Sequence, residues 1–243
     1  MDIEEFLKYC IEGYLFKDLE NISKIHVTKG DVGEASFPML SSILAGMELL
    51  GAIVNPKGAV TVTSGKREID GGNQFDHYWI YYLSSLDKKY TGFNKLFYDL
   101  LRNGIVHTFM VKQHVIVYKT HHNHMSCSQD PPGLIIGCIE LFRDFQQTYF
   151  NHVVPILKTE HSVTHVNRGT MQSNLDAILD LYSNEADTQF RNLQISKYTP
   201  VLNIPLTPTQ GVSLSPYDIK DFVDYSGGTT TPSGINWQPK KKS

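Results

Sequence analysis

The spacing of apolar residues after Phe93 constrains the fold of this chain more than any other feature. Counting from Phe93, apolar side chains recur at offsets of 3, 4, 7, 8 and 12 residues: Leu96, Phe97, Leu100, Leu101 and Ile105. A helix places residues with this spacing on one face, whereas a half-buried strand would need strict alternation. The Asn103-Gly104 pair is a hairpin signal, but the longer pattern predicts a helix that continues through it.

Similar spacing recurs along most of the chain and predicts a mainly α-helical protein. We expect further helices over about 3–22, 37–54, 74–90, 141–157 and 171–193. The helix at 37–54 has apolar residues around most of its circumference, which is typical of the centre of a bundle. This stretch is also shorter than the roughly 20 residues of a membrane span, so we expect a buried helix there and no membrane association.

Two runs rich in β-branched residues depart from the helical pattern. The segments HVIVYKTHH (114–122) and GLIIGCIE (133–140) flank a polar loop with two prolines, which predicts an antiparallel hairpin. Turn-forming residues over 55–72 predict a long surface loop with a short strand at 60–63. We therefore expect a helical domain over 1–195, including a β-hairpin at about 114–140, and an irregular or disordered tail over 196–243.

Composition narrows the functional classes. The 243-residue chain has a formal net charge of -3, so any contact with RNA must be local rather than spread over a basic surface. The three cysteines, Cys10, Cys127 and Cys138, fit no disulfide framework and suit a reducing compartment. The acidic start MDIEEFLKYC does not resemble an export signal, and we expect a cytoplasmic protein.

The helix that begins at Phe93 carries a polar window with residues suited to phosphate chemistry. Asn103 and His107 are four residues apart and share a face, while Arg102 points about 140° away from His107 and borders the same surface. An imidazole can transfer protons near neutral pH, a guanidinium can hold two phosphate oxygens, and a carboxamide can orient a reacting group. RNA supplies its own nucleophile, the 2′-hydroxyl, so such a window suits RNA cleavage without a metal or cofactor.

The segment Arg102-Asn103-x-x-x-His107, near the end of a helix, resembles the R-x4-6-H motif of the HEPN superfamily. The resemblance covers roughly residues 3–159 and implies a small helical bundle, here with a β-hairpin after the motif helix, that commonly forms a homodimer. It also implies a metal-independent endoribonuclease of a toxin-antitoxin pair or of antiviral defence, with an antitoxin or a defence complex as a partner. Arg102 and His107 would be the catalytic pair and Asn103 the supporting polar residue.

Lys112, just past the motif helix, is a candidate for binding backbone phosphate of the RNA substrate, or else a partner of the helix dipole. Two features depart from the family pattern. Toxins silenced by a nucleotidyltransferase carry a tyrosine two places after the histidine, where this chain has Phe109. The strand pair and the 55–72 loop are additions to a minimal bundle.

Structural alternatives stay open for each candidate. His107 could be a core histidine and Arg102 a surface partner of Asp99, in a HEPN-like bundle that serves as a scaffold or a nucleotide or RNA sensor. The histidines and cysteine of HHNHMSC could bind zinc, but no second ligand pair follows, which favours a solvent-exposed loop. The aromatic residues of the 74–90 helix could stack bases, although their spacing favours the core. These last two sets are His121, His122, His124 and Cys127, and Tyr78, Trp79, Tyr81 and Tyr82.

Overall fold

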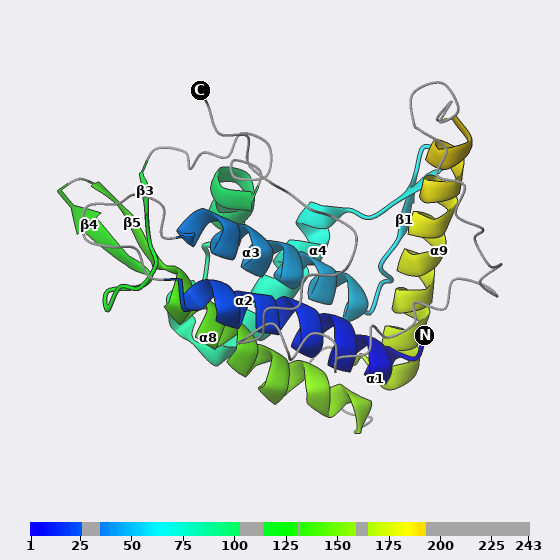
Figure 1. The fold of residues 1–243 in the computed structure, drawn as a ribbon, viewed down its shortest axis with the longest axis horizontal. Helices are drawn as coiled ribbons and strands as arrows, with labels where there is room; N and C mark the ends of the chain where they lie inside the picture. The colour runs from blue at the N-terminus through cyan, green and yellow to red at the C-terminus, as the bar shows by residue number, and fades with distance from the viewer. Residues whose placement is uncertain (26–34, 103–113, 131, 159–164, 193–243) are drawn as a thin grey trace, which may run out of the picture. The chain divides into compact units, whose positions relative to one another are not determined.

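The structure, a computed structural model, describes residues 1–25, 35–102, 114–130, 132–158 and 165–192. This part of the chain is mainly helical with small sheets (Figure 1), as the apolar spacing predicts. The predicted tail at 196–243 lies outside the described residues. So do three of the predicted site residues, Asn103, His107 and Lys112.

Helix α3 (Ser36–Ile53) is the central helix of the fold. It contacts α2 (Lys17–Ser23), α4 (Gly71–Tyr78), α8 (Cys138–Thr148) and α9 (Arg168–Asn192), and Figure 1 shows it between these neighbours. Among the described helices, α3 alone has the length and composition of a membrane span, and 56% of that window is buried inside the protein. A core helix passes the same test, and its buried side chains confirm the predicted central position.

The other helical segments also follow the predicted apolar spacing, and several contain π-type or 3-10 turns. The aromatic residues of the predicted 74–90 helix belong to the core, except Tyr81, which is 49% exposed. The bounds of the segments are α1 (Ile3–Phe6), η1 (Leu7–Phe16), η2 (Trp79–Leu83), α5 (Ser84–Leu86), η3 (Lys88–Tyr90), α6 (Asn94–Leu96), η4 (Phe97–Arg102), η5 (Tyr149–Val153) and η6 (Val154–Leu157).

A glycine allows α3 and α4 to approach closely. A Cβ on Gly51 would overlap with the carbonyl of Gln74 and would lie 3.2 Å from Cβ of Tyr78. The start of α4 is fixed by Asp70, whose carboxylate accepts a hydrogen bond from the backbone N–H of Asn73. The beginning of α4 is therefore held tightly against the second half of α3.

Buried amide side chains join α9 to the ends of α3 and α4. Asn174 accepts a hydrogen bond from the N–H of Ala59 (3.1 Å) and donates to the carbonyls of Ile53 and Asn55 (both 2.9 Å). The Asn55 amide in turn donates to Oε1 of Gln74 (2.8 Å). Because each bond satisfies a polar group that is shielded from water, this network fixes where α9 lies against the other helices.

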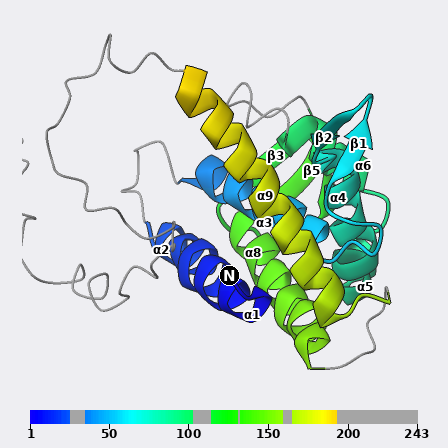
Figure 2. The ribbon, with the colours of Figure 1, turned by 90° about the vertical axis from the view of Figure 1, so that its right-hand side faces the viewer.

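The predicted surface loop at 55–72 contains a hairpin of strands β1 (Thr61–Thr63) and β2 (Lys66–Glu68). Its two turn residues, Ser64 and Gly65, have φ values of 54° and 79°, as a two-residue type I′ turn requires. The hairpin lies beside α9 in Figure 1, and Figure 2 shows both elements from the side; Arg67 of the hairpin pairs with Asp180 of α9 at 2.6 Å. The loop is thus more ordered than the sequence indicates.

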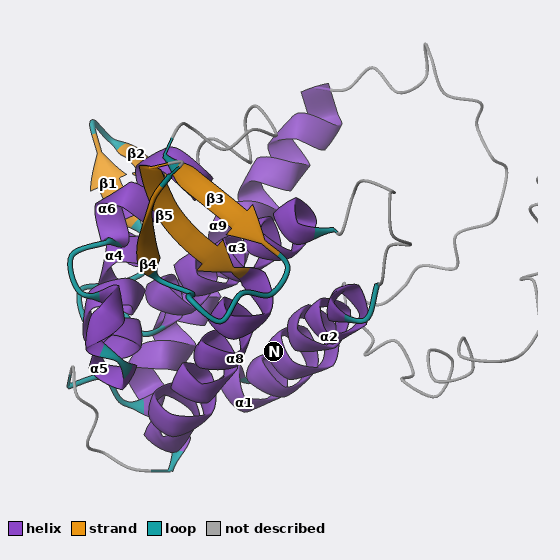
Figure 3. Ribbon diagram, turned by 90° about the vertical axis from the view of Figure 1, so that its left-hand side faces the viewer, coloured by secondary structure: helices purple, strands orange, loops and turns teal. Residues whose placement is uncertain are grey.

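The predicted antiparallel hairpin between the two β-branched runs was wrong. Strands β3 (Val115–Tyr118) and β5 (Pro132–Gly137) are parallel, and β4 (Ser126–Gln129) pairs antiparallel with β5 on its other edge. Figure 3 shows these three strands together. The hairpin is formed by β4 and β5, because the segment that reads as a polar loop includes the polar, largely exposed edge strand β4.

Candidate functional site

Arg102 lies at the end of η4, where its guanidinium is held by the carboxylate of Glu48 on α3. The two groups form paired hydrogen bonds, Nε to Oε2 at 2.8 Å and Nη2 to Oε1 at 3.1 Å. The Arg102 and Glu48 side chains are 24% and 17% exposed. Since two parallel bonds fix the guanidinium plane as well as its position, Arg102 has a defined orientation at the border between core and solvent.

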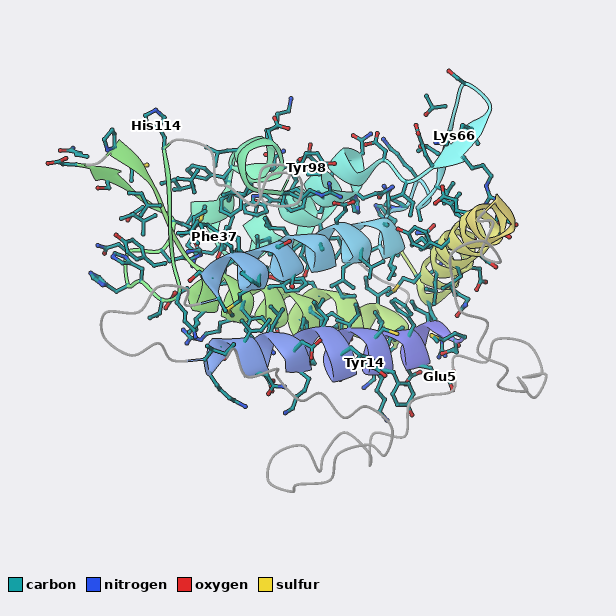
Figure 4. All side chains as sticks on the ribbon, turned by 45° about the horizontal axis from the view of Figure 1, so that its top comes forward. Glu5, Tyr14, Phe37, Lys66, Tyr98 and His114 are labelled. Carbon is teal, nitrogen blue, oxygen red and sulfur yellow. The ribbon has the colours of Figure 1, made fainter. Side chains whose placement is uncertain are left out.

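The ring of Tyr98 gives the guanidinium a second support. Cζ of Arg102 lies over this ring, 5.6 Å from its centroid, and the ring is also 5.6 Å from that of Phe75. Figure 4 shows Tyr98 above α3, the helix that carries Glu48. Burial, with the nearby Glu48 charge, raises the pKa of the Tyr98 hydroxyl. Tyr98 therefore stays protonated at neutral pH, and its ring contributes a cation–π contact.

The start of α4 leaves space for this arrangement. A Cβ on Gly71 would overlap with Oε1 of Glu48 and would lie 3.1 Å from the Tyr98 hydroxyl oxygen. On α9, burial and the charge of Glu48 also raise the pKa of the Tyr182 hydroxyl. Residues from α3, α4 and η4 thus lie beside the Arg102–Glu48 pair.

Of the predicted catalytic residues, the structure locates Arg102. Asn103, His107 and the predicted phosphate contact Lys112 lie outside the described residues. Asp99, the alternative partner of Arg102 suggested by the sequence, is exposed, and the structure pairs Arg102 with Glu48. Glu48 was not predicted for this role. The sequence feature that could have pointed to Glu48 is its position in a helix that otherwise supplies the core. A carboxylate shielded from water there needs a partner of opposite charge.

The histidine-rich segment is not simply a solvent-exposed loop. Nδ1 of His124 accepts a hydrogen bond from the N–H of Gly137 (3.1 Å), so Nε2 carries the proton and donates to the Tyr90 hydroxyl (2.8 Å). Tyr90 then donates to Asp144 (2.7 Å), which also pairs with Lys89 (2.6 Å). Burial lowers the pKa of His124 to about 4. Because its two nitrogens bond to Gly137 of β5 and to Tyr90 of η3, the His124 ring joins the three-stranded sheet to the helices.

The proposed zinc ligands are not gathered into one cluster. Cys127 is exposed on β4, while His124 uses both ring nitrogens in the network with Gly137 and Tyr90. Within the described ranges, no group of three or more His, Cys, Asp or Glu side chains could hold a metal ion.

Comparison of the chain with known protein families, with curated proteins and with solved structures found no match. The function is therefore inferred from the residues themselves. Among the predicted catalytic residues, Arg102 is the one that the structure describes, with Nε and Nη2 bonded to Glu48.

Proposed function

We propose that this protein is a metal-independent, HEPN-type endoribonuclease that acts in the cytoplasm as a toxin or as part of antiviral defence. The observation that best supports this is the fixed orientation of Arg102, the first residue of the R-x4-6-H pattern. A guanidinium held by Glu48 and Tyr98 needs little reorganisation when charge develops on a phosphate. Its partial exposure keeps it within reach of a substrate.

In the proposed reaction the 2′-hydroxyl of RNA attacks the adjacent phosphorus. His107 takes the 2′-hydroxyl proton, Arg102 stabilises the charge of the phosphorane, and Asn103 positions one of these groups. The bond between the 2′-oxygen and phosphorus forms as the bond to the 5′-oxygen breaks, and the protonated His107 gives its proton to this leaving oxygen. The products are a 2′,3′-cyclic phosphate and a 5′-hydroxyl. Lys112 binds a neighbouring backbone phosphate.

We also propose that the active form is a homodimer. On one continuous helix, Arg102 and His107 would point about 140° apart, which is unfavourable for holding one phosphate. A two-fold axis beside the motif would bring His107 of one protomer toward Arg102 of its partner. Light scattering is expected to give twice the chain mass, and a strict monomer at the concentrations used for activity assays would contradict this assembly.

The paired bonds to Glu48 favour one competing function. A carboxylate in the fork of a guanidinium occupies donors that would otherwise bind phosphate. In a HEPN-like scaffold or a nucleotide or RNA sensor, the same pair would simply tie η4 to α3. Such a protein would bind RNA or a partner without cleaving it.

Substitution of the substrate nucleophile tests the proposed chemistry. The wild-type protein should cleave RNA in excess chelator and leave cyclic phosphate ends, whereas a single 2′-deoxy nucleotide at the cleavage position should block that cut. Lys66→Ala, on the exposed strand β2 far from η4 in sequence, serves as the matched protein control and should retain activity. Unchanged cleavage of the 2′-deoxy substrate would refute attack by the 2′-hydroxyl.

A further inference from the structure

Three aromatic rings are stacked at the end of β3. The ring of Tyr118, the last residue of β3, lies 4.7 Å from that of His121 at an interplanar angle of 24°. The rings of His121 and His122 are 4.9 Å apart at 15°. These three side chains form a ring column with His121 in the middle.

The two outer rings of the column are accessible to solvent. Tyr118 is 43% exposed and His122 is exposed, whereas His121 between them is only partly exposed. Each outer ring stacks on His121, and both outer residues keep part of their surface in contact with solvent. This exposed ring area is the part of the column that a further flat ring would contact.

Hydrogen bonds hold the middle ring and its backbone in place. The N–H of Asn123 donates to Nδ1 of His121 (3.1 Å), and the N–H of His121 donates to Oε2 of Glu140 (3.1 Å). Glu140 also accepts a hydrogen bond from the Thr120 hydroxyl at 2.6 Å. The turn packs closely on β5, since a Cβ on Gly137 would lie 3.0 Å from the His121 nitrogen. Because the middle ring is already held, its ordering adds little conformational entropy cost to binding.

We propose that the ring column, Tyr118, His121 and His122, is a stacking surface for an unpaired base of the RNA substrate. This inference rests on the proposed function and adds a preference for single-stranded RNA. Tyrosine and histidine rings both stack on unpaired RNA bases, and stacking tolerates any base because each has a π face. The column is also connected to His107 by 11 residues of chain, which span at most about 40 Å.

The charges beside the column indicate that stacking, not phosphate binding, provides most of the affinity there. The Glu140 carboxylate is engaged by Thr120 and His121, and Nζ of Lys119 donates to the carbonyl of Ile25. With few phosphates neutralised at this surface, loss of a ring should lower affinity by a similar factor at low and high salt.

The test uses His107→Ala protein, which should bind RNA without cutting it, and a single-stranded RNA containing 2-aminopurine. This His107→Ala protein is the parent for the other variants, and its binding should quench the fluorescence of 2-aminopurine. Tyr118→Ala or His122→Ala in this background should weaken binding roughly 5- to 150-fold, as expected for the loss of one base–ring stack. Tyr118→Phe keeps the ring and should bind like the parent. Tyr14→Ala, which removes a tyrosine of similar exposure (45%) on η1, is the matched control.

Equal binding by the parent and both alanine variants would overturn the proposal, as would equal weakening by Tyr118→Phe and Tyr118→Ala. Absence of parent binding to single-stranded RNA would also overturn it. A blunt RNA duplex, whose bases are already stacked, should show no dependence on the column. Cleavage is measured separately with wild-type protein. If the wild-type protein does not cleave RNA but binding still depends on the rings, the endoribonuclease proposal fails and the column remains an RNA-binding surface. The two failures are therefore distinguishable.

Discussion

At the scale of single residues, the pairing of Arg102 with Glu48 is the most informative contact. Both charges are partly shielded from water, and the bonds of 2.8 and 3.1 Å between them define the guanidinium plane. An isolated surface pair would add less than about 1 kcal/mol of stability, whereas shielding and paired geometry increase the cost of removing one partner. We infer that Glu48 positions Arg102 for its proposed contact with phosphate.

Replacing Glu48 by Gln should separate positioning from stability. The amide keeps the size of the side chain but offers one acceptor in place of two and no charge. We expect kcat for RNA cleavage to fall about 10- to 100-fold with little change in KM, because a displaced guanidinium loses mainly transition-state contacts. Unfolding free energy should fall by about 1–2 kcal/mol. Glu48→Asp should restore part of kcat. Unchanged kcat per folded molecule would leave the pair with a purely structural role.

Removal of the Tyr78 hydroxyl should increase the unfolding free energy, whereas replacement of Glu48 should decrease it. Among the described residues it is the buried side-chain oxygen without a hydrogen-bond partner, and burial raises the pKa of Tyr78 well above its usual value. Tyr78→Phe should therefore raise the unfolding free energy by about 1 kcal/mol. In Tyr90→Phe, the matched control, bonds to His124 and Asp144 are lost, and the free energy should fall by about 1–3 kcal/mol. Denaturant titration of both variants measures the difference, and destabilisation by Tyr78→Phe would contradict this view of the core.

The sequence predicts a site role for Arg102, but it does not predict the contacts that orient this side chain. Arg102 belongs to a short local pattern, whereas Glu48 is 54 residues away and approaches only after α3 and η4 pack together. Likewise, the space at Gly71 is apparent only once Glu48 and Tyr98 are in place. Local spacing thus predicts which groups have suitable chemistry, while tertiary packing determines which of them meet.

At the scale of secondary structure, the helices could be predicted and the strand pairing could not. Helical apolar spacing is repeated over many residues of one segment, so a helix can be predicted from the sequence of that segment alone. The pairing of β5 depends on β4, a four-residue edge strand with a polar sequence, SCSQ. Its polar residues suit an exposed edge and conceal the alternation that would indicate a strand. The order β3-β5-β4 therefore became visible only in the fold.

Two substitutions of helical glycines by alanine should change the unfolding free energy in opposite directions. In Gly51→Ala the added Cβ overlaps with the Gln74 carbonyl, so α3 and α4 must separate, and we expect a loss of at least about 2–3 kcal/mol in unfolding free energy. Gly13 is exposed in η1, and the nearest atom to an added Cβ is the Lys8 carbonyl oxygen at 3.4 Å. Gly13→Ala should therefore add about 0.5–1 kcal/mol. Thermal unfolding of the pair tests this, and equal stability of the two variants would contradict the packing described.

The His124 ring, which joins the three-stranded sheet to the helices, should contribute less to stability in acid. Burial, followed by the charge of Lys89, lowers the pKa of His124 to about 4 in the folded protein, below the usual value of 6.5. The unfolded chain therefore binds a proton first as pH falls, and the stabilising contribution is lost between about pH 6.5 and 4. Integrated over pH 7 to 4, this loss is about 3 kcal/mol.

His124→Gln removes this titration and isolates its effect. Urea unfolding measured at intervals from pH 7 to 4 should show a shallower loss of stability in this variant than in the wild type. His122→Gln, which changes an exposed neighbouring histidine, is the control and should follow the wild-type curve. Identical pH curves for wild type and His124→Gln would show that the His124 ring does not act as a buried neutral link.

At the scale of the whole molecule, the fold brings together groups that are distant in the chain. The core helix α3 supplies Glu48, η4 supplies Arg102 and Tyr98, and the start of α4 leaves the space in which they meet. The three-stranded sheet, joined to the helices through His124, carries the ring column. The proposed endoribonuclease therefore combines a cleavage site supported by the helical core with a base-stacking surface on the sheet.

Whether Arg102 and His107 catalyse RNA cleavage is measured by an assay in excess chelator with wild-type, Arg102→Ala and His107→Ala proteins at equal folded concentration. We expect metal-independent cleavage by the wild type and a loss of at least about 100-fold in each variant, because proton transfer and charge stabilisation each contribute roughly that much. Lys66→Ala should remain active. Equal cleavage by all of these proteins, or no cleavage by any, would contradict the assignment of Arg102 and His107.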